Sequence, residues 1–182
     1  MKEIRIHGRG GQGVVTSAEL LALAVFNDGK FSQAFPFFGF ERRGAPVVSF
    51  VRINDSPIRL RSHIYNPDYV IVQDPTLLDI EDVTAGLKPS GMVIANTEKE
   101  PEKLGLKPEI RVRTINATKI AMETLGHPIM NTALIGAFAG ATGEVSVESI
   151  KCAVTSRFSG KLGVKNAEAV QKAYDRMRGQ IK

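Results

Sequence analysis

The segment from Lys2 to Phe26 reads KEIRIHGRGGQGVVTSAELLALAVF. Apolar and polar residues alternate over residues 2–7, which predicts a short strand. Residues 14–26 form a nearly continuous apolar run, and Asn27-Asp28-Gly29 after it is a helix stop signal. A strand, a glycine-rich turn and a helix in this order open a βαβ unit. The sequence therefore predicts an α/β fold from its N-terminal segment onward.

The turn between this strand and this helix has the spacing of a phosphate-binding loop. Gly8, Gly10 and Gly13 fit G-x-G-x-x-G, with Gly11 in addition. Glycine lets the backbone approach a ligand closely, and the first amides of the helix offer free N–H groups to an anion. Arg9 adds a positive charge. The pattern predicts contact with a phosphate or pyrophosphate; a tight turn without a ligand is the alternative.

A nicotinamide-binding enzyme of this type places Asp or Glu about 20 residues after the glycine turn, where it holds a ribose. Here that neighbourhood, residues 31–35, reads FSQAF and contains no acid. Arg42 and Arg43 lie too far along the chain to replace it. The sequence therefore disfavours NAD as the ligand.

The rest of the chain alternates further strands with helices. We expect side-chain N-caps at Asn116, Asn131, Ser146 and Asn166. Strands are expected at 31–35, 47–53, 69–72, 91–96 and 110–113, with 58–61 pairing with 47–53 in a hairpin, and helices at 77–86, 116–125, 131–141, 146–157 and from 166 to the end. This order predicts a Rossmann-like three-layer α/β fold with an open, mostly parallel sheet and a β-hairpin insertion. We expect a single domain over residues 1–182, with a basic helical C-terminal part at about 146–182.

The segment 35–46 is expected to be a loop rich in aromatic residues. It contains Phe35, Phe37, Phe38 and Phe40, followed by Glu41, Arg42 and Arg43. Aromatic side chains in such a loop either fold back onto the core or contact another subunit. Adjacent arginines bind phosphates and carboxylates in a bidentate manner. The alternative is a structural loop in which the arginines pair with surface acids such as Glu41.

Composition and charge restrict the class of protein. The 182 residues are 43% hydrophobic and 24% charged, which is ordinary for a globular domain. The net charge is +5; residues 151–182 hold eight basic residues against Glu168 and Asp175, a local charge of +6, so the remainder sums to −1. Such a segment suits an acidic partner, an anionic ligand or nucleic acid, and a solvated helix face is the simpler interpretation.

The sequence shows no constellation of catalytic residues and no metal site. Cys152 is its single cysteine, so the chain cannot form an internal disulfide or hold an iron–sulfur cluster alone. The three histidines are not at metal-ligand spacing. No stretch is long and apolar enough for a membrane helix, and we expect a cytoplasmic protein. A phosphate-type loop without catalytic groups suggests a binding module or a subunit.

Taken together, these motifs resemble the gamma subunit of the 2-oxoacid:ferredoxin oxidoreductases, in particular the pyruvate and ketoisovalerate enzymes. The resemblance covers nearly the whole chain, and the combination of GRGGQG with FERRGAP is specific. It is carried by IRIHGRGGQGVVTSAELLA at 4–22, SQAFPFFGFERRGAPVVSFVRI at 32–53, NPDYVIVQDPTLL at 66–78, GMVIANT at 91–97 and NTALIGAFAGATG at 131–143.

This resemblance implies a subunit of a complex that oxidises a 2-oxoacid, with coenzyme A, to acyl-CoA and CO₂ and reduces ferredoxin. It implies that thiamine diphosphate and iron–sulfur clusters belong to partner subunits of the alpha, beta and delta types. The gamma chain would then hold no cofactor alone and would help to bind coenzyme A and assemble the complex. Separately from the resemblance, the aromatic loop of an isolated chain would lack its partner, so we expect self-association in that state. Neither nucleic acid nor a membrane is an expected partner.

The resemblance also implies which residues contact coenzyme A, a molecule with a pyrophosphate and a ribose phosphate. They are Gly8, Arg9, Gly10, Gly11, Gln12 and Gly13 of the glycine turn, Arg42 and Arg43 of the basic loop, and Asn131 at the start of the NTALIGAF helix. Two alternatives stay open: a stand-alone nucleotide-binding oxidoreductase of Rossmann type, and an assembly scaffold that binds no ligand. The identity of the 2-oxoacid is open as well, with pyruvate first.

Overall fold

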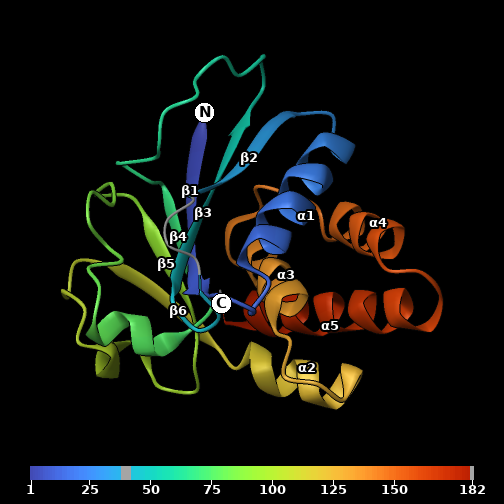
Figure 1. Ribbon diagram of the computed structural model, residues 1–182. Coiled ribbons are helices and arrows are strands. Elements are labelled where there is room, and N and C mark those ends of the chain that lie inside the picture. Colours follow the sequence, from blue (N-terminus) through green and yellow to red (C-terminus); the bar gives the residue numbers. More distant parts are fainter. Residues whose placement is uncertain (38–41, 181–182) are drawn as a thin grey trace.

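The computed structural model describes residues 1–37 and 42–180 and contains a six-stranded sheet (Figure 1). The strands are β1 Lys2–Arg9, β2 Phe31–Phe37, β3 Pro46–Asn54, β4 Tyr69–Val72, β5 Met92–Asn96 and β6 Arg111–Ile115. Their order is β2-β3-β1-β4-β5-β6. β1, β4, β5 and β6 are parallel, whereas β3 is antiparallel to both β1 and β2. The expected open, mostly parallel sheet is therefore confirmed.

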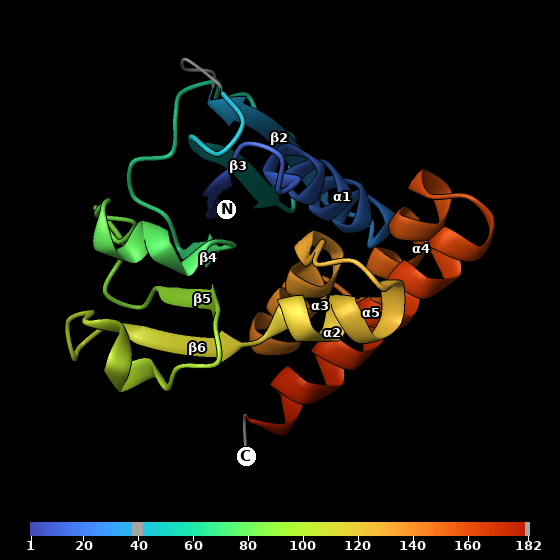
Figure 2. The same cartoon turned by 60° about the horizontal axis from the view of Figure 1, so that its bottom comes forward.

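The α-helices gather on one face of this sheet, and short 3₁₀ helices cover the other (Figure 2). The α-helices are α1 Val14–Asn27, α2 Ala117–Leu125, α3 Asn131–Thr142, α4 Val147–Arg157 and α5 Gly160–Gly179, and the 3₁₀ helices are η1 Pro75–Asp79 and η2 Pro101–Leu104. Neighbouring residues of a strand point to opposite faces, so Ile71 joins the core under the α-helices while Val70 and Val72 join a smaller core with Leu77 of η1. None of the described helices is long and apolar enough to cross a membrane.

The antiparallel partner of β3 differs from the expected one, residues 58–61. Residues 58–61 are not a strand; β3 pairs instead with β2, with Ala34 opposite Val51. The segment after β3 crosses the sheet, and Arg52 holds it there. The buried Arg52 guanidinium donates to the carbonyl oxygen of Ser62 at 2.7 Å and to Glu3 Oε1 at 2.9 Å. A buried cation requires such partners, and this requirement sets the path of the segment.

Part of the expected aromatic loop also belongs to this antiparallel pair. Phe35 and Phe37 lie in β2, where their rings contact Phe50 at 5.1 Å and His63 at 4.8 Å between centroids. Phe38, Phe40 and Glu41 lie outside the described residues, as do Ile181 and Lys182 at the end of the chain.

Helix caps were predicted well where the cap is local. The side chains of Asn116 and Ser146 accept from the backbone amides of Lys119 and Ser149, as expected for N-caps of α2 and α4. The expected helix at 77–86 is wrong, because only η1 forms there.

Two asparagines do not act as N-caps. Asn131 is the first residue of α3 rather than its cap, and Asn166 lies inside α5. Instead, the buried Asn166 Oδ1 accepts from Thr132 Oγ1 at 2.8 Å and so ties α5 to the start of α3.

Asp28, at the end of α1, joins this helix to the start of α4. Its carboxylate accepts from Ser146 N at 2.7 Å and from Ser146 Oγ and Ser149 Oγ at 2.6 Å each. Burial alone would raise the pKa of Asp28, but these hydrogen bonds outweigh burial and hold the pKa below its ordinary value of 3.8. The charged form is thus favoured in the folded state.

We expect Asp28→Asn to lower the free energy of unfolding at pH 7 by about 1–3 kcal/mol, because hydrogen bonds to a charged group are lost. A depressed pKa stabilises the fold above the unfolded pKa, and this contribution disappears as the pH falls through the folded pKa. The difference between the variant and the parent should therefore shrink below pH 4. Urea unfolding at pH 7 and pH 3 measures it, with the exposed Asp55→Asn as control; an equal loss at both pH values would contradict the assignment.

Candidate functional site

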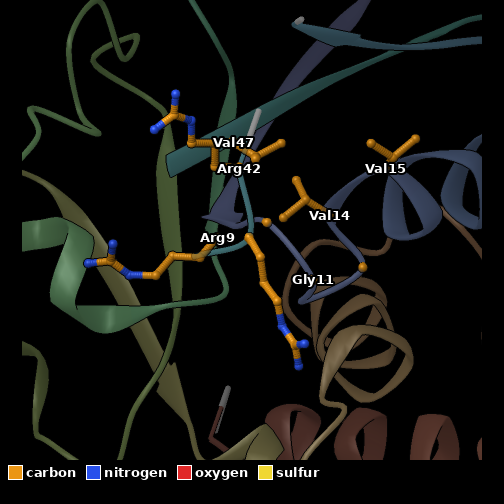
Figure 3. A pocket seen from close by; sticks show the side chains of 9 residues that line it. Arg9, Gly11, Val14, Val15, Arg42 and Val47 are labelled. Carbon is orange, nitrogen blue, oxygen red and sulfur yellow. The ribbon is translucent and has the colours of Figure 1, made fainter. Parts of the chain in front are cut away.

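A cavity of about 560 Å³ opens where β1 ends and α1 begins (Figure 3). It is lined by Arg9, Gly10, Gly11, Gly13, Val14, Val15, Arg42, Arg43 and Val47. It lies at the carboxyl end of β1, beside β4 on one side and β3 on the other. This is the edge of an open α/β sheet at which ligands bind. The structure thus brings the glycine turn and the arginine pair, far apart in the sequence, to one cavity.

The turn leaves the N-terminus of α1 open to the cavity. Gly13 precedes the helix with φ 76°, a left-handed conformation that favours glycine, and no side chain caps α1. In the described part of the chain, the backbone amides of Gly11, Val14 and Val15 have no hydrogen-bond acceptor. The first turn of α1 contains no acid either. The helix therefore presents free donors and the positive end of its dipole to whatever occupies the cavity.

Two backbone hydrogen bonds attach the arginine pair to the glycine turn. Gly10 N donates to Ala45 O at 2.8 Å, and Gly44 N donates to Gly10 O at 3.0 Å. They continue the β1–β3 pairing beyond its last pair, Arg9 opposite Pro46. A Cβ at position 10 would lie 2.5 Å from Arg42 O, so no other residue fits without displacing this segment.

Arg9 is engaged by the protein itself. Its guanidinium lies 3.2 Å from Asp74 Oδ2, and it donates to Thr76 Oγ1 at 2.7 Å and to Gly44 O at 3.0 Å. Figure 3 shows its side chain extending toward η1, which Asp74 precedes. Arg9 thus lines the cavity, but its charge is largely balanced and its main role is to hold the segment at Gly44.

Asp74 binds two polar side chains of the turn, those of Arg9 and Gln12. Gln12 Nε2 donates to Asp74 Oδ2 at 2.8 Å, while Gln12 Oε1 accepts from Arg9 N at 2.8 Å. Burial alone would raise the pKa of Asp74, but hydrogen bonds from Thr76 and Gln12 and the charge of Arg9 bring it below its ordinary value. The carboxylate therefore stays charged at neutral pH and holds both Arg9 and Gln12. Sequence reasoning missed Asp74 as a site residue; the available signal was its place two residues after the end of a buried strand.

Three of the expected site residues do not line this cavity. Gly8 pairs with Val47 within the β1–β3 ladder, and Gln12 is occupied as described. Asn131 is 4% exposed and lies against the turn from behind, since a Cβ on Gly13 would approach its Nδ2 to 2.5 Å. These residues support the turn. The lining residues not expected from the sequence are Val14, Val15 and Val47.

The free charges of the cavity belong to Arg42 and Arg43. Both are exposed, and neither has an ion pair among the described residues; their expected partner Glu41 lies outside that part of the chain. The described lining contains glycine, valine and arginine, with no hydroxyl, thiol, imidazole or carboxylate. Such a site suits the binding of an anion, above all a phosphate, and offers no group for acid–base or nucleophilic chemistry.

We expect Gly10→Ala to lower the free energy of unfolding by about 1–3 kcal/mol, because the new methyl group displaces Arg42 O and breaks both backbone hydrogen bonds. Amide hydrogen exchange over residues 42–45 should accelerate at the same time. Gly179→Ala, which has open space around its Cβ, is the control. Unchanged stability and exchange in Gly10→Ala would contradict the close approach.

Comparisons with known proteins identify the family of this chain. Residues 3–176 match the family model of pyruvate ferredoxin/flavodoxin oxidoreductase. The chain is 64% identical over 180 residues to pyruvate synthase subunit PorC of Methanosarcina barkeri, with 99% of each chain covered. It is 57% identical over 180 residues to the pyruvate/ketoisovalerate oxidoreductases common subunit gamma of Pyrococcus abyssi, with 97% of each covered.

Solved structures give the same result. The pyruvate oxidoreductase subunit PORC of Thermotoga maritima superposes with a TM-score of 0.85 at 35% identity, over 96% of this chain and 95% of that one. A 2-oxoglutarate:ferredoxin oxidoreductase of Magnetococcus marinus, with 2-oxoglutarate, coenzyme A and succinyl-CoA bound, contains the fold within 31% of its chain, with a TM-score of 0.80 and 19% identity. That likeness concerns the fold alone. From the family match and the high identities, the chain belongs to the pyruvate ferredoxin/flavodoxin oxidoreductase family, as a chain of the gamma-subunit type.

Proposed function

We propose that this chain serves a complex that oxidatively decarboxylates a 2-oxoacid, pyruvate above all, with coenzyme A to acyl-CoA and CO₂ and reduces ferredoxin. The Methanosarcina relative is named for pyruvate synthase, which favours pyruvate. The Pyrococcus relative is named as common to pyruvate and ketoisovalerate oxidoreductases, which favours substrate selection by other subunits. Thiamine diphosphate and the iron–sulfur clusters would belong to alpha, beta and delta-type partners.

The contribution that we propose for this chain is a contact with coenzyme A together with help in assembling the complex. One observation carries this proposal: the first residues of α1, whose amides are free, line a single cavity with Arg42 and Arg43, which have no ion pair among the described residues. Coenzyme A carries a pyrophosphate and a ribose phosphate, and both kinds of donor bind phosphate oxygens. The absence of acid–base groups among the described lining residues supports a non-catalytic role, so we propose that the isolated chain is inactive.

Membership of the complex is tested by purification from an anaerobic extract. We expect the tagged chain to isolate together with thiamine-binding and cluster-binding chains. The preparation should reduce ferredoxin only when pyruvate and coenzyme A are both present. A chain that isolates alone and binds a dinucleotide would instead support a stand-alone oxidoreductase of Rossmann type.

The arginine assignment is tested in the assembled complex. We expect Arg42→Ala and Arg43→Ala each to raise the KM for coenzyme A about tenfold, because a charged hydrogen bond to phosphate contributes about 1.5–3 kcal/mol. The KM for the 2-oxoacid should not change. Arg59→Ala and Arg61→Ala, two exposed arginines outside this cavity, are matched controls for the loss of charge.

Dephospho-coenzyme A, which lacks the ribose phosphate, then separates the two phosphate groups. If the penalty of a variant disappears with this analogue, that arginine binds the ribose phosphate; if the penalty persists, the arginine binds the pyrophosphate. An unchanged KM for coenzyme A in both variants would contradict the site. Normal assembly with normal kinetics would favour a ligand-free scaffold.

A further inference from the structure

The two edges of the sheet differ in charge. β6, at one edge, reads RVRTI and carries Arg111 and Arg113. β2, at the other, reads FSQAFPF and carries no charged residue over 7 positions. Proteins protect edge strands from pairing with other chains by placing charges on them. β6 has this protection, whereas the one edge-blocking residue of β2 is Pro36.

Pro36 establishes which backbone groups of β2 point away from the sheet. Antiparallel pairs alternate between hydrogen-bonded and non-hydrogen-bonded positions, and Pro36, opposite Ser49, has no N–H to donate. Position 36 is therefore part of a non-hydrogen-bonded pair, and so are Ala34 and Ser32, two and four positions earlier. The N–H groups of Ser32 and Ala34 and the C=O groups of all three residues turn outward. No acceptor or donor for them lies within the described residues.

An extended backbone is the chemistry that satisfies a row of outward N–H and C=O groups. Phe31 and Phe37 lie at equal distances from Ala34, one at each end of the strand, so two antiparallel copies centred on Ala34 would bring unlike ends of the strand together as like residues. Two copies that meet antiparallel about Ala34 would exchange N–H···O=C bonds between their Ala34 residues. Ser32 N–H of each would reach Pro36 C=O of the other, which leaves the C=O of Ser32 as the single unmatched group.

The side chains support the same pairing. Ser32 Oγ donates to Ala22 O of α1, so Ser32 and Ala34 face the helix, and Phe31 and Phe37 lie on the opposite face. Phe31 is 44% exposed and Phe37 is 45% exposed. The antiparallel arrangement places each Phe31 opposite the Phe37 of the other copy, an aromatic cross-strand pair. The strand adds no charge repulsion, and the basic helix α5 lies far from β2 (Figure 2).

We propose that β2 is a pairing edge that binds a second copy of this chain, antiparallel about Ala34, and so joins two sheets into one. The proposal concerns the chain itself and does not depend on the coenzyme A site. A pair of 7-residue strands covers less surface than a standard protein interface. Association should therefore be weak, with a dissociation constant of about 10 μM or above.

Light scattering and amide hydrogen exchange of the full chain test this proposal. As the concentration rises from about 1 to about 500 μM, the mean mass should increase from 19.8 kDa toward twice that value. The amides of Ser32 and Ala34 should become protected over the same range. We expect Phe31→Lys to weaken association at least tenfold, because it replaces one ring of each Phe31–Phe37 cross-strand pair with a charged side chain.

Ala34→Pro is the second variant. It removes an outward N–H and leaves the donors to β3 in place, so it should abolish the dimer without opening the β2–β3 pair. Leu162→Lys, at a residue 51% exposed on α5, is the matched control and should leave association unchanged. Thermal unfolding checks that each variant is folded. If a variant fails to fold, the proposal is tested in the parent chain alone, by whether amide hydrogen exchange of Ser32 and Ala34 slows as the protein concentration rises.

Three results would overturn the proposal. The chain could stay at 19.8 kDa at every concentration. The chain could associate while the amides of Ser32 and Ala34 stay unprotected, or Leu162→Lys could weaken association while Phe31→Lys does not. Either result would place the contact elsewhere. Finally, protection of these amides could require the other subunits of the complex. In that case the edge would serve a strand of a different chain.

Discussion

The candidate site depends on two hydrogen bonds between the backbone of Gly10 and the segment at Gly44 and Ala45. They extend the pairing of β1 with β3 past the end of both strands. Through them, a turn at the start of the chain and an arginine pair more than 30 residues later line the same cavity. The requirement for glycine at position 10 follows from this contact, because Arg42 O occupies the space of a side chain.

The charged residues around the turn have two different roles: some stabilise the turn, and others are proposed to bind the ligand. Asp74 neutralises Arg9 and holds Gln12, so these polar groups stabilise the turn. Arg42 and Arg43 have no ion pair among the described residues and line the same cavity as the first residues of α1. Because an ion-paired guanidinium loses much of its attraction for a second anion, the exposed pair would contribute more than Arg9 to the anion binding that we propose. The motif GRGGQG thus shapes the turn, while the groups proposed to bind the anion lie mostly outside the motif.

Local signals predicted much of the fold and six of the nine residues that line the cavity. The strand–turn–helix unit, the buried strands β4 and β5 and the caps of α2 and α4 depend on neighbouring residues, and the sequence shows them directly. The strand that pairs with β3 does not follow from neighbouring residues. Residues 58–61 alternate as a strand does and look as strand-like as β2, and it is the hydrogen bonds of Arg52 to distant acceptors that keep 58–61 out of the sheet. Similarly, Asn166 has the composition of a cap but serves a long-range contact with Thr132.

The cavity and the free edge belong to one structural element. β3 runs directly from the arginine segment, and its residues 48–54 pair with the whole length of β2, so the antiparallel pair is a stiff ribbon between the two places. Anything that ordered one end of this ribbon would alter the freedom of the other. Thermodynamic linkage makes such an effect reciprocal: an occupant of the edge that changed the affinity of the cavity for an anion would itself be bound more or less tightly, by the same factor, when the anion is present.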